Sequence, residues 1–185
     1  MDGLSTLPRR REFAFGRSFF LQRLLLFSVL VAGVLVVLGL QFAAPGAWIA
    51  AFGVLFGVFI VVWGISPLLT THWLTTTRII LRQGWYFRAA IPMREIESVS
   101  RFEGDAPLGL RAPLGQRRLY ATGSKVGLLS LKLHQPRRFW AVLGVEVDEI
   151  VFDVESPAQF LEALGGRQAS LAPVEPKRPD PYLRD

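Results

Sequence analysis

Two long apolar runs, residues 24–42 and 47–69, dominate the first half of the chain. No Asp, Glu, Lys or Arg lies between Leu24 and Leu69, and only a short segment with Pro45 and Gly46 separates the runs. A bilayer core about 30 Å thick needs roughly 20 apolar helical residues to cross it, and helices satisfy their own backbone groups in lipid. The pattern therefore predicts a two-helix transmembrane hairpin. The first run is too long for a signal peptide, and a chain of 185 residues offers no soluble core that could bury both helices.

Small residues are spaced at helical intervals within the second run. Gly53 and Gly57 form a small-xxx-small pair, and Gly64 follows two turns later. Such positions allow helix backbones to approach closely inside a membrane. We expect the hairpin to pack on itself, and homo-oligomerisation through the same face is the alternative.

After the second run, short segments rich in β-branched and aromatic residues alternate with turns, which is typical of strands. Between Arg78 and Arg82, Ile79 and Leu81 share one face and the two arginines share the other. Similar patterns predict strands at residues 85–93, 97–102, 127–134, 137–142 and 149–154, with a hairpin about Gln135 and Pro136. In the last strand, Ile150, Phe152 and Val154 share one face.

After this last strand, the spacing of apolar residues becomes that of a helix. Ser156, Pro157 and Gln159 match the N-cap, first helical position and third position of a capping box. Apolar residues at helical spacing follow, and Gly165 and Gly166 are suited to a helix C-terminus. This predicts a helix over residues 157–164. Strands followed by one amphipathic helix favour a small barrel that the helix caps at an open end.

Three stretches carry a family resemblance. The first matches at Leu74, Thr75, Arg78, Ile79 and Gly84, the second at Ile91, Pro92, Ile96 and Val99, and the third at Ser156, Pro157, Phe160 and Leu164. Together with the hairpin, they resemble the bacterial PH-like (pleckstrin-homology-like) domain proteins. The resemblance covers residues 71–166 and implies a PH-like β-barrel domain. It implies fold more than activity, because members are typically membrane-tethered proteins of unassigned biochemical role.

Two further segments lack a clear period. Residues 103–123 contain the sequence Ala-Pro-Leu-Gly twice and are expected to form a long loop between strands. A partner-binding loop is the alternative, with Leu110, Leu114 and Leu119 as its apolar contacts. The tail, residues 167–185, has four prolines and mixed charges, so we expect it to be disordered.

The charges around the hairpin predict its orientation. The formal net charge is +6, and five arginines but only two acids occur in the N-terminal segment, residues 1–23. After the second run, the first charged residues are Arg78, Arg82 and Arg88. Lys and Arg near helix ends favour the cytoplasmic side. We therefore expect a multi-pass protein of the bacterial inner membrane with both termini in the cytoplasm.

Candidate chemistry is sparse. The chain has no Cys and only two His, so thiol chemistry and zinc–thiolate sites are excluded, and no nucleophile, base and oxyanion donor can be assembled from the sequence. We expect no enzyme activity and no cofactor. The basic residues suit a membrane surface better than nucleic acid, because the hairpin already places them beside lipid.

Two functions follow as expectations. The first is a non-catalytic, membrane-anchored interaction module that recruits or holds protein partners at the cytoplasmic face. The second is a reader of anionic lipid or envelope stress that binds phospholipid headgroups through arginines near the membrane exit. The lipid-surface candidates are Arg78, Arg82, Arg88, Arg137 and Arg138.

Overall fold

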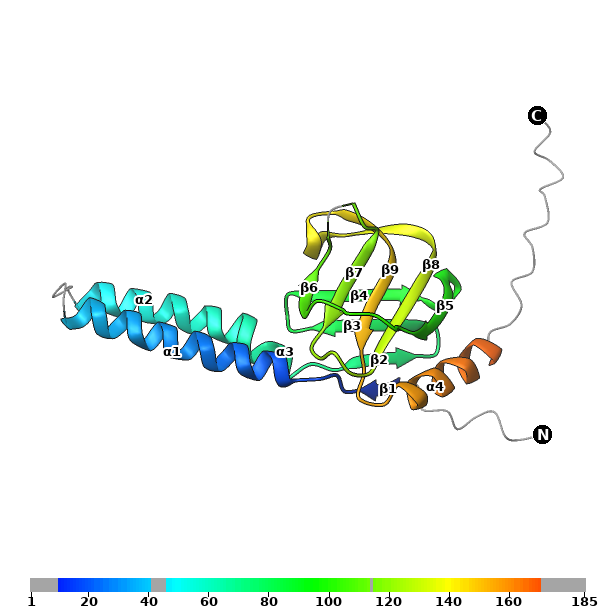
Figure 1. Cartoon of the computed structure of the whole chain (residues 1–185), viewed down its shortest axis with the longest axis horizontal. Helices are drawn as coiled ribbons and strands as arrows, with labels where there is room; N and C mark the ends of the chain where they lie inside the picture. The colour runs from blue at the N-terminus through cyan, green and yellow to red at the C-terminus, as the bar shows by residue number, and fades with distance from the viewer. Residues whose placement is uncertain (1–9, 41–45, 114, 171–185) are drawn as a thin grey trace, which may run out of the picture.

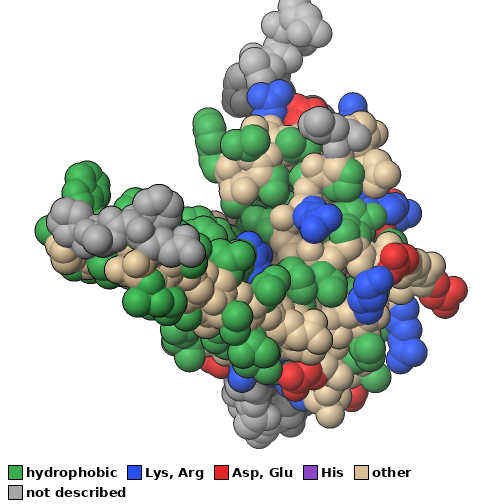
Figure 2. Space-filling view, turned by 60° about the vertical axis from the view of Figure 1, so that its left-hand side comes forward, with side chains coloured by type: hydrophobic (Ala, Val, Ile, Leu, Met, Phe, Trp, Pro, Cys, Tyr) green, Lys and Arg blue, Asp and Glu red, His purple; other side chains and the backbone are tan. Residues whose placement is uncertain are grey.

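The structure is a computed structural model that describes residues 10–40, 46–113 and 115–170. Two long helices project from one side of a domain that consists of two β-sheets and a C-terminal helix (Figure 1). On the face shown in Figure 2, hydrophobic side chains cover the projecting helices, whereas the charged side chains lie mostly on the β domain. The coarse prediction, a helical hairpin followed by a mainly-β domain and one helix, is confirmed.

The projecting helices are α1 (Ser18–Leu40) and a second helix that begins as α2 (Gly46–Phe59). Each spans 23 residues and is almost entirely apolar, and at most 11% of the apolar stretch of either helix is buried. The core helix of a soluble protein would be mostly buried, so both are candidate membrane spans. Helix α1 begins at Ser18 rather than Leu24, and it therefore includes Arg23.

The second helix becomes irregular before it ends. Helix α2 continues as the π-helix η1 (Ile60–Ile65) and the short helix α3 (Ser66–Leu68). Pro67 lacks the N–H that an uninterrupted helix would need here, and the neighbouring Ser66 hydroxyl donates to the Val62 carbonyl. Short π segments often occur at functional sites, and this one lies where the helix meets the β domain.

Of the three glycines at helical spacing in the second helix, only Gly64 lies close to α1. A Cβ on Gly64 would lie 2.8 Å from Cδ1 of Leu24 in α1, whereas a Cβ on Gly53 or Gly57 would meet no atom within 4 Å. The hairpin does pack on itself, and Phe27 of α1 contacts Phe59 of α2 edge-to-face at 5.4 Å. The two helices therefore meet through side chains such as these rather than through close approach at Gly53 and Gly57.

Among the described residues, one strand precedes the hairpin. Strand β1 (Arg10–Phe13) pairs antiparallel with β2 (His72–Thr75), and β3 (Arg78–Gln83) and β4 (Phe87–Pro92) complete a sheet in the order β1-β2-β3-β4. The sequence pattern does not predict β1, because three of its four residues are charged. Both ends of the hairpin therefore lead into neighbouring strands of one sheet.

Five further strands form the second sheet. They are β5 (Ile96–Arg101), β6 (Gly109–Arg111), β7 (Arg118–Thr122), β8 (Leu128–Phe139) and β9 (Val145–Asp153), with the 3-10 turns η2 (Met93–Glu95) before β5 and η3 (Trp140–Val142) before β9. The order in the sheet is β5-β8-β9-β7-β6, with β7 and β9 parallel and the other pairs antiparallel. The described strands thus form two sheets, and the expected closed barrel does not occur.

Two local predictions in this sheet are wrong. Residues 103–123 are not one long loop, because β6 and β7 lie within them. Strand β8 continues through Gln135 and Pro136, where a hairpin was predicted, and a register shift against β9 between Lys132 and Arg137 accommodates the proline. The chain instead reverses at η3.

The predicted inward faces are confirmed. Ile79 and Leu81 of β3 are fully buried, as are Ile150 and Phe152 of β9. Helix α4 (Pro157–Ser170) buries Phe160 and Leu164 against this core.

Helix α4 runs past its predicted end. It continues through Gly165 and Gly166 to Ser170, so residues 167–170, which were predicted to be disordered, are helical. Residues 171–185 lie outside the described part of the chain.

Phe13 connects β1 to this core, and its ring meets Phe160 edge-to-face at a centroid distance of 4.9 Å. Phe13→Ala should lower the free energy of unfolding by about 3–5 kcal/mol, because a large buried ring is replaced by a cavity. Urea unfolding of the full chain in detergent, followed by near-ultraviolet circular dichroism, measures the change. Val126→Ala, at a side chain that is 79% exposed, is the control and should change the value by less than about 0.5 kcal/mol. Equal effects would show that β1 is not an integral strand.

Candidate functional site

Three of the five lipid-surface candidates converge on one cleft. Arg88 comes from β4, and Arg137 and Arg138 come from the end of β8. Together with Tyr86 and Trp140, they line a cleft of about 330 Å³ between the edge of the first sheet and the β8–β9 turn. We call this the basic cleft.

The arginines of the basic cleft differ in their partners. Arg137 donates from Nη1 to the Ala90 carbonyl at 3.0 Å and to Glu95 at 3.1 Å. Arg138 donates from Nε and Nη2 to one oxygen of Glu146, at 3.0 and 2.8 Å. Within the described residues, Arg88 has no ion-pair partner.

The ion pairs of the cleft leave it able to accept an anion. The hydrogen bonds and charge of Arg138 lower the pKa of Glu146, so that carboxylate is ionised at neutral pH. Exposed ion pairs of this kind contribute little to stability. Three arginines facing two carboxylates leave an excess positive charge, and an anion can compete for the guanidinium groups. The fork of a guanidinium matches phosphate oxygens in geometry.

The basic cleft begins where the second helix ends. Trp63 of η1 stacks on Tyr86 at a centroid distance of 6.2 Å. The backbone N–H of Trp85 donates to the Ser66 hydroxyl at 3.1 Å. In Figure 1, the turn between β8 and β9 lies on the side of the β domain from which the helices project.

Arg82 lies beside the basic cleft, on the outer face of the first sheet. Its guanidinium lies 4.5 Å from the ring centroid of Trp73, and that of Arg10 lies 3.3 Å from the same ring. Arg82 is also directly opposite Arg88 in the β3–β4 register. Like charges opposite each other destabilise a sheet, and a bound anion would relieve this repulsion.

Arg78 lies at the other end of β3, remote from the end of the second helix. Its backbone N–H donates to the Thr75 hydroxyl in the β2–β3 turn at 3.1 Å, whereas the Gly84 end of β3 contacts Thr70 after α3. Arg78 therefore does not contribute to the basic cleft.

The leucines proposed as partner contacts do not form one surface. Leu119 is fully buried in the core, so it cannot contact a partner in this fold. Leu110 is half-buried and lines a groove of about 570 Å³ between α1 and β6, together with Arg23, Phe27 and Arg111. Leu114 lies outside the described residues.

A buried carboxylate joins the β domain to the start of α1. Asp153, at the end of β9, accepts the backbone N–H of Gly16 at 2.7 Å and that of Gly123 at 2.6 Å. Burial raises the pKa of Asp153 to about 6, although both N–H groups act in the opposite direction. A Cβ on Gly123 would collide with the Gly16 carbonyl, and a Cβ on Gly16 would collide with Ser124, so this junction requires glycine at both positions.

His72 lies buried beside this junction. Its ring stacks on Phe15 at 4.8 Å and meets Phe152 edge-to-face at 5.7 Å. Nδ1 accepts the Arg82 backbone N–H at 3.2 Å, so the ring acts as an acceptor there. Burial lowers the pKa of His72 to about 3, and the backbone of Asp153 opposes this only in part.

Sequence reasoning misses this junction. Asp153 falls on the strand face opposite Phe152 and Val154, where an exposed residue is expected, and His72 lies at the predicted membrane exit. The glycines at 16 and 123 were the available signal, but nothing in the sequence connects them to a carboxylate in a distant strand.

The described residues contain no group of three or more His, Cys, Asp or Glu that could hold a metal ion. Comparison with protein-family models, curated proteins and solved structures finds no match for the chain. The basic cleft and the groove beside α1 are therefore interpreted from their own chemistry. Both combine arginine with apolar or aromatic side chains beside a candidate membrane span.

The buried pair predicts a specific pH dependence. The folded pKa of His72 is lowered from 6.5 to about 3, so its neutral form contributes stability that is lost as pH falls below about 6.5. The folded pKa of Asp153 is raised from 3.8 to about 6, so its contribution increases as pH falls from about 6 to 4. The two effects oppose each other between about pH 4 and 6.

His72→Asn retains an acceptor near the Arg82 N–H but does not titrate. Between about pH 6 and 4, the free energy of unfolding of the variant should increase relative to that of the unsubstituted protein by about 1.4 kcal/mol for each unit that the pH falls. The reason is that the variant no longer takes up a proton at residue 72 when it unfolds. Urea midpoints of both proteins from pH 4 to 6.5 measure the difference. Parallel pH profiles would contradict the assignment.

Proposed function

We propose that the chain is a membrane-anchored, non-catalytic module that binds anionic phospholipid headgroups at the cytoplasmic face of the bacterial inner membrane. The observation that carries this proposal is the convergence of Arg88, Arg137 and Arg138 on one cleft beside the end of the second helix. Near an anionic leaflet, each such residue contributes about 1 kcal/mol. A headgroup phosphate is the anion that this position would meet most often.

The proposed orientation rests on the flanks of the hairpin. Because β1 pairs with β2, both helix ends lead to the same domain, and a domain that contains both lies on one side of the bilayer. Arg17 directly precedes α1, Arg23 lies in its second turn, and Arg82 and Arg88 follow the second helix. An excess of Lys and Arg near the ends of membrane helices favours the cytoplasmic side.

The PH-like fold is part of the same proposal. Two packed sheets with the C-terminal helix α4 against their core share the order of strands followed by one helix that the family resemblance implies, although the described strands do not close into a barrel. Fold alone does not assign a ligand, so the lipid proposal rests on the basic cleft. Protein recruitment stays a prediction. It has less support from the geometry, because Leu119 is buried and Leu110 lies in the groove beside α1.

A charge reversal in the basic cleft tests lipid binding. The full chain would be placed in nanodiscs of phosphatidylcholine, with or without phosphatidylglycerol, and hydrogen exchange measured for residues 86–92 and 137–142. Phosphatidylglycerol should slow exchange in both segments. Arg88→Glu should weaken this protection by about 2 kcal/mol, or roughly thirtyfold, because two units of charge change beside the anionic surface.

Arg78→Glu is the matched control, since it reverses an exposed arginine at the opposite end of β3 and should leave the protection unchanged. Equal effects of the two variants would mean that general charge, rather than the basic cleft, attracts the membrane. No effect of phosphatidylglycerol on either segment would overturn the proposal and leave protein recruitment as the better explanation.

A further inference from the structure

The turn between β8 and β9 carries the two most exposed large hydrophobic side chains of the described β domain. Trp140 is 92% exposed and Leu143 is 97% exposed, compared with 62% for Trp85 and 79% for Val126. Neither side chain contributes to the core of the two sheets. Their apolar character is therefore not explained by folding, and neighbouring exposed apolar residues often mark a surface that binds something.

The backbone of this turn makes the choice of leucine more unusual. Leu143 has φ 58° and ψ 31°, in the left-handed region, and it is the one non-glycine residue with positive φ among the described residues. Glycine or asparagine adopts this conformation at lower cost. Leu143 N–H donates to the Trp140 carbonyl and Gly144 N–H to the Phe139 carbonyl, at 3.1 and 3.0 Å. The turn is thus held closed while it presents a leucine at its tip.

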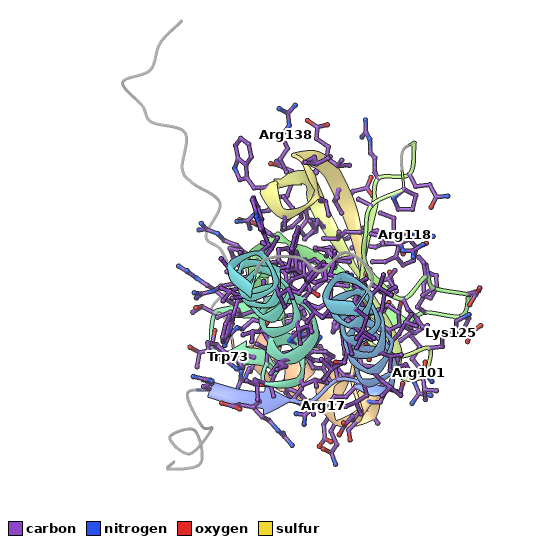
Figure 3. The ribbon with its side chains drawn as sticks, turned by 90° about the vertical axis from the view of Figure 1, so that its left-hand side faces the viewer. Arg17, Trp73, Arg101, Arg118, Lys125 and Arg138 are labelled. Atoms are coloured by element: carbon purple, nitrogen blue, oxygen red, sulfur yellow. The ribbon has the colours of Figure 1, made fainter. Side chains whose placement is uncertain are left out.

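The turn lies on the side of the β domain that faces the proposed membrane. It is on the same side as the projecting helices in Figure 1. In the view along the hairpin, Arg138 lies above the two helices next to this turn (Figure 3). A tryptophan and a leucine at the tip, with Arg137 and Arg138 three and two residues before the tryptophan, match the distribution found at a lipid interface, where aromatic rings lie at headgroup level and cations lie near phosphate.

We infer that this turn, residues 140–144, inserts Trp140 and Leu143 into the interface of the leaflet beside the hairpin. The inference rests on the proposed membrane placement and adds a second point of attachment, which the arginines alone do not provide. A domain joined to the bilayer at one hairpin can still tilt relative to the membrane surface. A second contact at the turn restrains that tilt and holds the basic cleft against the headgroups.

The absence of cysteine from the chain permits a direct test. Leu143→Cys and Trp140→Cys would each be labelled with an environment-sensitive fluorophore and the full chain reconstituted into vesicles that contain a spin-labelled phospholipid quencher. Ser98→Cys, at an exposed position in β5 on the side away from the hairpin, is the matched control. Quenching at both turn positions should exceed that at the control several-fold, with a blue-shifted emission. Equal quenching at all three positions would overturn the inference.

Two further measurements distinguish insertion of the turn into lipid from contact between two copies of the chain, and from headgroup binding by the basic cleft. If two copies meet through this turn, oxidation of unlabelled Leu143→Cys would give efficient disulfide dimers, and this result would overturn insertion into lipid. If the turn inserts but the basic cleft binds no headgroup, quenching would persist while phosphatidylglycerol gave no protection of residues 86–92. If the basic cleft binds and the turn does not insert, that protection would persist without quenching at position 143.

Discussion

The pairing of β1 with β2 is the constraint on which the rest of the structure depends. These strands lie side by side in one sheet although the whole hairpin separates them in sequence. The chain must therefore leave the β domain, form two long apolar helices and return to the neighbouring strand. Asp153 fixes this departure point, because its carboxylate holds the backbone N–H groups of Gly16 and Gly123 where no side chain would fit.

This constraint determines where the arginines lie. Since both helix ends are tied to one sheet, the strand ends that meet the hairpin form one face of the domain, and β4 begins on that face. The contacts from Trp63 to Tyr86 and from Ser66 to Trp85 connect the end of the second helix to the turn before β4. Arg88 thus reaches the basic cleft through local geometry, whereas Arg137 and Arg138 reach it because β8 extends past its bulge towards the same edge.

The sequence predicts what local periodicity controls and misses what depends on distant contacts. The apolar runs identify both long helices, and alternation identifies the buried faces of β3 and β9. Strand β1 is not predicted, because most of its residues are charged. Strand β8 is not predicted as one strand, because Pro136 suggests a turn where the structure has a bulge. For the site, the candidate arginines can be named from sequence, but their convergence cannot, because it depends on which strand ends share an edge. Asp153 and His72 give no periodic signal at all.

Tethering changes how strongly such a surface must bind. A free domain would need the exposed arginines of the basic cleft to overcome the full loss of translational and rotational freedom on reaching a membrane. In the proposed membrane placement, a domain carried by its own hairpin would meet headgroups at a high effective concentration, so weak contacts would suffice to hold one orientation. Arginines that retain exposed carboxylate partners, as Arg138 does with Glu146, suit weak binding of this kind, because their ion pairs contribute little to stability and exchange readily for phosphate. A weak surface responds to the charge of the leaflet, whereas a tight one would remain occupied regardless of lipid composition.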